Sequence, residues 1–380
     1  MAGAKWSDFG SIWKTIREVD IAAIRTEAGH DVLVACVGDR EALRRMYDLL
    51  QLGPDQYPTP WSALGLVPLD QVTTRERLIG EADLLIVALH AEVTLDAAEL
   101  AGLARLEALS PRRRLLVLVG EPPASARSVL RRLDRGSTLV LRPRAADARD
   151  RLAAAVLDAL PAGRRLAAAR RLPGLRPHYA HRLTNEVSLS NGAFVVASGL
   201  PSLVPVLGIP IAAADTLVLT KNQALMVYRL ALAFGAPPEF QKRMLEITPV
   251  IGAAVMWRQV AGGLVGLIPG YGIVPKTVVA FAGTWITGRA AELYYGTGLV
   301  SKDDLRRFSE EAVSRARAAA GEMARRARAA RDRTTRTRRA GSRVRAGVRR
   351  LTPRRGKKAA EHPDRAAEYP DSPPAPPHRD

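Results

Sequence analysis

The sequence predicts an α/β domain with a parallel sheet, then an all-α, apolar helical-hairpin domain, then a disordered basic tail. Three observations lead to this prediction. Runs of valine and leucine alternate with helical patterns over residues 31–161, residues 187–214 contain no charged side chain, and eighteen of the 57 arginines and lysines lie within residues 315–358. Apolar runs that alternate with helices are typical of a parallel sheet covered on both faces.

Four segments of the α/β domain, residues 31–161, are strong strand candidates. They are DVLVACV (31–37), ADLLIVALH (82–90), RLLVLVG (114–120) and STLVLRP (137–143). A helix is expected after each, most clearly at residues 40–50 and 95–108. Residues 52–80 contain four prolines and are expected to hold one weaker strand.

Two shorter segments flank this domain. Within residues 1–30, an apolar face at helical spacing predicts an amphipathic helix over residues 5–20. Its members are Trp6, Phe9, Trp13, Ile16 and Val19. Docking onto the chain's own domain is favoured over binding to a membrane surface, and the two tryptophans keep the second possibility open. Residues 162–186 are expected to be a basic connector.

Residues 187–298 form the apolar helical part. The charge-free stretch 187–214 contains three prolines, and a second charge-free stretch, 259–275, precedes Lys276. Helices are expected at about 213–234 and 275–295, each followed by glycine. The similar sequences LVPVLGI (203–209) and LIPGYGI (267–273) each precede one of these helices, which suggests two related hairpins.

The net charge of +19 is concentrated near the C-terminus. Residues 315–358 contain eighteen basic and two acidic residues, a net charge of +16. Residues 299–350 are expected to be a basic helix rich in alanine and arginine, and residues 351–380 a disordered tail. This charge favours an anionic membrane surface or nucleic acid as partner, and a solvated extension is the third possibility. No aromatic residue is interleaved for base stacking.

The sequence contains no motif for catalysis or cofactor binding. The segment VACVGDREALRR, which follows the first strand, lacks the second glycine, the lysine and the hydroxyl of a phosphate loop. His178 and His181 lack a clear third metal ligand, and the single cysteine, Cys36, is expected to be buried. We therefore expect no catalytic residue, no nucleotide, no metal and no cofactor.

Polar residues that interrupt the apolar part are the site candidates. The alternative is that they form ion pairs that only stabilise the fold. They are Asp215, Lys221, Gln223, Arg229, Arg258, Lys276 and Arg289. Ala280, Thr284 and Gly288 repeat a small residue every four positions. This spacing permits close helix packing, either within the chain or in a homo-oligomer.

Three segments also carry a family resemblance: IPIAAADTLVLTKNQALMVYRLALAFG (209–235), the pair Trp257–Arg258, and GLIPGYGIVPKTVVAFAGTWITGRAAELYYGTG (266–298). Together they resemble the domain-of-unknown-function family six-nine-seven, a membrane-linked family associated with GTPases. The positions that match its pattern are Asp215, Gln223, Trp257, Arg258, Pro269, Gly270, Gly272, Lys276, Thr284, Gly288, Arg289 and Ala290.

The resemblance implies a GTPase as a protein partner, and it implies that residues 31–161 are a degenerate GTPase-like (G-domain-like) domain. The sequence departs from an active GTPase at three places. It lacks the phosphate-loop lysine and the D-x-x-G motif after the ADLLIVAL strand, and Gly120–Glu121–Pro122 stands where N-K-x-D is expected. GTP hydrolysis is therefore not expected.

Two functions of different class follow. The first is a non-enzymatic, membrane-associated interaction or scaffold protein at the cytoplasmic face of a bacterial membrane, with residues 187–298 in or on the bilayer as a broken helix or hairpin. The alternative is a soluble scaffold in the cytoplasm that works with a GTPase, its helices forming an all-α core. A GTP-binding protein with an atypical site and nucleic-acid binding through the tail are the remaining alternatives.

Overall fold

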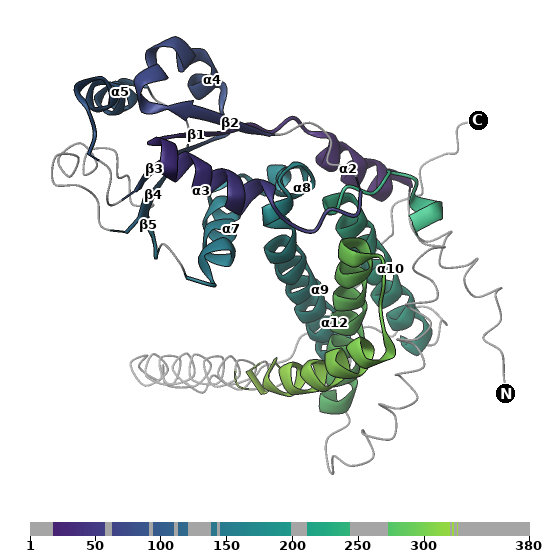
Figure 1. The fold of residues 1–380 in the computed structure, drawn as a ribbon. Coiled ribbons are helices and arrows are strands. Elements are labelled where there is room, and N and C mark those ends of the chain that lie inside the picture. Colours follow the sequence, from purple (N-terminus) through teal and green to yellow (C-terminus); the bar gives the residue numbers. More distant parts are fainter. Residues whose placement is uncertain are drawn as a thin grey trace, which may run out of the picture. The chain divides into compact units, whose positions relative to one another are not determined.

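The computed structural model describes residues 18–57, 63–90, 94–109, 113–120, 138–142, 145–198, 211–243, 273–319, 321–322 and 325. Residues 1–323 form one compact unit and residues 324–380 a second. The first unit contains the sheet and the long helices (Figure 1).

The predicted parallel sheet is confirmed, and residues 52–80 supply its fifth strand. The strands are β1 (Val34–Gly38), β2 (Leu64–Pro68), β3 (Leu84–His90), β4 (Arg114–Val119) and β5 (Thr138–Leu141). All neighbours are parallel, in the order β2-β1-β3-β4-β5. This is the flavodoxin-like doubly wound order, in which the direction of winding reverses between β1 and β3.

Helices cover both faces of the sheet. They are α3 (Arg40–Gln51), α4 (Glu76–Glu81), α5 (Ala97–Ala108) and α7 (Ala148–Ala159). Helix α2 (Glu18–Gly29) precedes β1 in the chain. Successive strand residues point to opposite faces. On β1, Val37 packs in a buried cluster with Leu103 of α5, whereas Cys36 packs in another with Met46 of α3.

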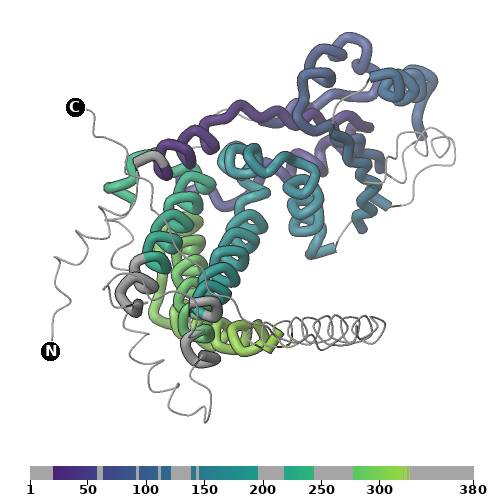
Figure 2. The backbone as a smooth tube through the Cα atoms, turned by 180° about the vertical axis from the view of Figure 1, so that it is seen from behind, coloured from purple at the N-terminus to yellow at the C-terminus, as the bar shows by residue number. Residues whose placement is uncertain are grey.

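A second group of helices follows the sheet. It comprises α8 (Ala162–Arg171), the short 3₁₀ helix η4 (Pro173–Leu175), α9 (Arg176–Ser198), α10 (Ile211–Ala233), α12 (Ile273–Thr297) and a further helix over residues 302–319. The helices predicted at 213–234 and 275–295 are therefore present as α10 and α12. From behind, the teal α9 and α10 and the green α12 lie side by side (Figure 2).

The segment expected to be a basic connector, residues 162–186, is instead part of the packed structure. It forms α8, η4 and the first half of α9, and Leu166, Leu172 and Leu175 in it are fully buried. The predicted boundary at residue 187 falls inside α9, because charge composition changes there but helical packing does not. The core that contains Met46 also contains Tyr228 and Phe234 of α10, so it joins the sheet to the long helices.

The long helices all have one end near the sheet. Gly296 of α12 lies beside Phe234, just beyond the end of α10, and beside Pro54, which follows α3. Helix α9 runs antiparallel to α10 and to α12. The opposite end of the bundle therefore contains Ser198, Ile211 and Ile273. We call this the remote end. Within the described ranges, no helix combines the length and the apolar composition that crossing a membrane requires.

Two arginines, the buried Arg176 and the half-buried Arg170, hold the sheet side of the bundle together. Arg176, fully buried, donates to the carbonyl oxygens of Pro54, Ala169 and Arg170 and to the carboxylate of Asp55. Arg170 donates to the carbonyl oxygens of Leu232 and Ala236 and so caps α10. Burial lowers the pKa of both guanidinium groups.

Replacing Arg176 by methionine is expected to lower the free energy of unfolding by about 3–5 kcal/mol, because buried carbonyl oxygens lose their donor. Asp55→Asn is the matched control. Asp55 is 46% exposed, so its loss is expected to cost less than about 1 kcal/mol. Urea unfolding of both variants measures the difference. Equal loss of stability in both would contradict this role of the carbonyl contacts.

Candidate functional site

The carboxyl ends of β1 and β3 are where a doubly wound sheet usually binds its ligand. Here Asp39 directly follows β1 and is almost fully buried. Its carboxylate accepts hydrogen bonds from the backbone N–H of Ala42, in the first turn of α3, and of His90, at the end of β3. A Cβ on Gly38 would lie 2.1 Å from the carbonyl oxygen of Ala88, so β1 and β3 are tightly apposed.

The Asp39 carboxylate occupies the position that a phosphate takes in a nucleotide-binding domain. A helix N-terminus attracts an anion through its free N–H groups and its dipole. In this chain the α3 N-terminus already has an internal carboxylate, which would repel a second anion. The described part of this site therefore favours the expectation that no nucleotide binds, which the missing phosphate-loop residues first suggested.

A buried polar cluster joins the three long helices. The hydroxyl of Thr284 on α12 accepts hydrogen bonds from Asn191 of α9 and Gln223 of α10, each at 3.0 Å, and donates to the carbonyl oxygen of Ala280 at 2.8 Å. Asn222 of α10 donates to Asn191 at 2.8 Å. One hydroxyl thus makes all three hydrogen bonds available to it. We call this set the Thr284 cluster.

Helices α9 and α12 also approach closely one turn along from Thr284. A Cβ on Gly288 would lie 2.4 Å from the hydroxyl oxygen of Thr184, so only glycine fits there. The hydroxyls of Thr184 and Ser188 are fully buried and have no hydrogen-bond partner among the described residues. Such groups reduce stability, and the close packing offsets this cost.

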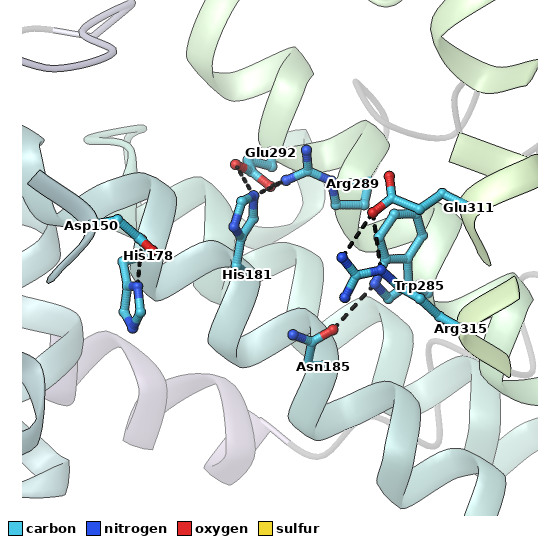
Figure 3. Close-up of polar contacts among 9 residues, drawn as sticks. All are labelled: Asp150, His178, His181, Asn185, Trp285, Arg289, Glu292, Glu311 and Arg315. Carbon is cyan, nitrogen blue, oxygen red and sulfur yellow. Dashed lines mark hydrogen bonds and ion pairs between the residues drawn. The ribbon is translucent and has the colours of Figure 1, made fainter. Parts of the chain in front are cut away.

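Arginines and aromatic rings form a second cluster, between α12 and the helix over residues 302–319. Figure 3 draws Trp285, Arg289 and Arg315 of this cluster. The guanidinium of Arg289 lies 5.8 Å from the ring centre of Trp285 and 5.4 Å from that of Phe308. Arg315, from the helix over residues 302–319, lies 5.3 Å from the Trp285 ring. Cation–π contacts of this kind fix the last helix onto α12. We call this set the Trp285 cluster.

Hydrogen bonds extend the Trp285 cluster to α9. The indole N–H of Trp285 donates to Asn185 at 3.2 Å, and Arg289 contacts both Glu292 and His181. His181 also lies 3.2 Å from Glu292. A hollow of about 70 Å³ opens among these groups, lined by His181, Asn185, Trp285, Arg289, Glu311 and Arg315. Its charges are mutually paired, and no serine or cysteine nucleophile lines it.

The two histidines considered as metal ligands have separate partners. His178 pairs with Asp150 of α7 at 2.7 Å, and His181 pairs with Glu292 of α12 (Figure 3). No group of three or more possible metal ligands occurs among the residues that the structure describes.

The predicted site residues fall into three sets. Gln223, Thr284, Gly288 and Arg289 are placed by the structure along the contacts of α12 with α9 and α10. Asp215 lies in α10 and Lys276 in α12, but the structure does not describe their side chains. Trp257, Arg258, Pro269, Gly270 and Gly272 lie outside the described residues.

Several members of the clusters were missed by sequence reasoning. Thr184, Ser188 and Asn191 recur at helical spacing, one polar stripe on α9, and all three are buried. This stripe was a detectable signal, but it lies across the predicted domain boundary and so was divided between two segments. No pattern in the sequence marks Trp285 or Glu292, and only their tertiary contacts reveal their roles.

A shallow groove runs along the other side of α9. It has a volume of about 330 Å³ and is lined by Leu183, Glu186, Val187 and Ser190 of α9 and by Asn222, Leu225, Met226 and Arg229 of α10. Each set recurs at i, i+3, i+4 and i+7, which is one face of a helix.

Comparison with protein-family models and with curated proteins yields no match for this chain. The resemblance drawn from residues 209–298 therefore remains a prediction. What the structure adds is a physical role for four of its positions: Thr284 and Gln223 share hydrogen bonds, Gly288 permits close approach, and Arg289 binds aromatic rings and a carboxylate.

Two glycines of α12 provide a matched test of the α9–α12 contact. Gly288→Ala is expected to lower the free energy of unfolding by about 1–3 kcal/mol, because the new methyl group overlaps Thr184. Gly283→Ala is expected to be neutral or to add up to about 1 kcal/mol, since no atom lies within 4 Å of its Cβ position. Thermal unfolding distinguishes them; a stable Gly288→Ala protein would contradict the described packing.

Proposed function

We propose that this chain is a non-enzymatic, membrane-associated interaction protein whose helical bundle contacts a bilayer at its remote end. One observation carries the proposal. Three helix ends, Ser198, Ile211 and Ile273, lie together at that end, and the sequence continues from them into segments 199–210 and 259–272. These two segments contain no charged residue and carry the two similar proline-glycine sequences.

The basic segment begins in a position that suits this proposal. Ala312 and Ala316 of the last helix share a buried cluster with Val278 and Phe281, in the half of α12 that leads to the remote end. Residues 315–358, with their net charge of +16, therefore start beside the bundle half that we assign to the membrane. Basic clusters next to an apolar anchor attract anionic lipids, by about 1 kcal/mol for each residue near the surface.

We assign to the α/β domain a role in binding a partner, and this role involves no nucleotide. Support comes from the Asp39 carboxylate, which occupies the N-terminus of α3. GTPase ancestry is not needed for this assignment, because the strand order is the flavodoxin-like one. A GTPase remains a proposed partner on the resemblance alone.

A soluble scaffold is the second candidate, and a specific observation favours it. The charged residues that shorten the apolar stretches are paired within the chain: Lys221 with Asp20, Arg229 with Glu27, and Arg289 with Glu292. The described halves of these helices therefore pack against protein. The two candidates differ only in what the remote end contacts.

Flotation of the full-length protein with vesicles tests the proposal. We expect it to rise with vesicles that contain anionic lipid and to remain bound in high salt, which screens the basic segment. Leu203→Glu with Leu207→Glu should lower the bound fraction at least about tenfold, because each buried leucine contributes about 1.5–3 kcal/mol.

Leu299→Glu is the matched control, because Leu299 is 77% exposed beyond the sheet-side end of α12. It should float like the unmodified protein. Absence of flotation in the unmodified protein would favour the soluble scaffold. Equal binding by the double variant and the control would exclude the remote end as the contact.

A further inference from the structure

Helix α12 and the helix over residues 302–319 share a buried apolar cluster of their own. Its fully described members are Val278, Phe281, Ala282, Trp285 and Ile286 of α12, with Phe308, Ala312 and Ala316 of the last helix. Among the described residues, no strand and no other helix contributes to this cluster, so it is separate from the two cores that contain the sheet. The members on α12 recur at i, i+3, i+4, i+7 and i+8, which is one face of a helix.

The polar side chains of the last helix are paired within that helix. Ser301 and Asp304 cap each other, because the backbone N–H of each donates to the side chain of the other at 3.1 Å. Three ion pairs follow at helical spacing: Arg306 with Glu310, Arg307 with Asp304, and Arg315 with Glu311. Every side-chain hydrogen bond that the structure describes for residues 301–319 stays within this range. The helix therefore keeps its polar contacts when it leaves α12.

The other contacts of the long helices are different in kind. Hydrogen bonds of the Thr284 cluster join α9, α10 and α12, and two ion pairs join α2 to α10. The last helix is held by apolar burial and by cation–π contacts. Phe308 is its anchor: it is 4% exposed, its ring centre lies 6.4 Å from that of Trp285, and Arg289 lies over its ring. Any helix with the same side chains would satisfy this face equally well.

A short connection joins the two helices. Residues 298–301 lie between the end of α12 and the start of the last helix. Gly298 has a φ of 81°, a conformation that favours glycine, and Leu299 is 77% exposed. Only these four residues need to change conformation for the helix to turn away from its own α12. Short hinges of this kind permit identical chains to exchange a helix.

We propose that the apolar face of α12 is a helix-binding site, which residues 302–319 fill within one chain and the same helix of a second copy fills in an exchanged dimer. The occupant is a second copy, because its helix reproduces every contact described for the first. At low concentration each chain fills its own site, since tethering gives its own helix the higher effective concentration. The inference does not depend on the proposed membrane function.

Two single variants of the full-length chain test this exchange. Ala312→Asp places a carboxylate on the buried side of the last helix, and Ala282→Asp places one on the buried face of α12. Each variant alone lacks either an intact helix or an intact face, so each should be monomeric. When the two are mixed, the intact face of the first accepts the intact helix of the second. A 1:1 dimer should then appear, measured by mass in solution.

The matched control is Ala312→Asp mixed with the double variant Ala282→Asp, Ala312→Asp, a mixture that contains no intact last helix. We expect it to associate at least about tenfold more weakly than the first mixture, because an unpaired charge is costly to bury. Thermal unfolding of each variant shows whether the rest of the fold is intact. Folded variants that stay monomeric when mixed would overturn the proposal. A dimer formed by either single variant alone would also overturn it, because another surface would then be responsible.

A deletion decides the question without a buried charge, should an aspartate variant fail to fold. Removing residues 298–300 leaves Ser301 alone between the two helices, fewer than the two to five residues that a helical hairpin needs. The connection also loses about 10 Å of reach. The last helix then meets only the α12 face of another copy, and we expect a dimer in place of the monomer. A folded, monomeric deletion variant would contradict the exchange.

Discussion

The hydroxyl of Thr284 is the group on which the arrangement of the long helices depends. It lies at the point where α9, α10 and α12 meet, and it accepts one hydrogen bond from each neighbouring helix while donating to its own. Thr284 and Asn191 are fully buried and Gln223 is 8% exposed, so water competes little for these hydrogen bonds. A buried polar group that is fully satisfied specifies one packing geometry, because any shift of a helix leaves a donor unpaired.

That constraint sets the positions of the other functional candidates. With Thr284 opposite Asn191, the next turn of α12 places Gly288 against Thr184, and the helices approach until only glycine fits. Arg289 then faces outward, where it reaches His181, Glu292 and the ring of Trp285. The same antiparallel contact of α9 with α12 brings the helix ends Ser198, Ile211 and Ile273 to one end of the bundle. The end of the bundle at which we propose a membrane contact is therefore defined by this arrangement of the helices.

The sequence predicted the local elements better than the relations among them. Strands β1, β3 and β4 were predictable because each is a continuous run of buried apolar residues. The connector over residues 162–186 was misassigned because its arginines suggest solvent, whereas Arg170 and Arg176 bond to buried carbonyl oxygens. Thr284 and Gly288 were found through their small size and spacing. Their partners on α9 were not, since a hydrogen bond between residues about 93 positions apart leaves no local pattern.

Hydrogen exchange in a Thr284→Val variant tests the central role of this hydroxyl most directly. Thr297→Val is the control, because Thr297 lies in the same helix and bonds only locally, to Leu293 and Leu299. The account predicts that amides of α9, α10 and α12 exchange faster together in Thr284→Val, by an amount equivalent to roughly 1–3 kcal/mol, while strands β1 and β3 remain protected. Faster exchange confined to α12, or equal to that of the control, would contradict it.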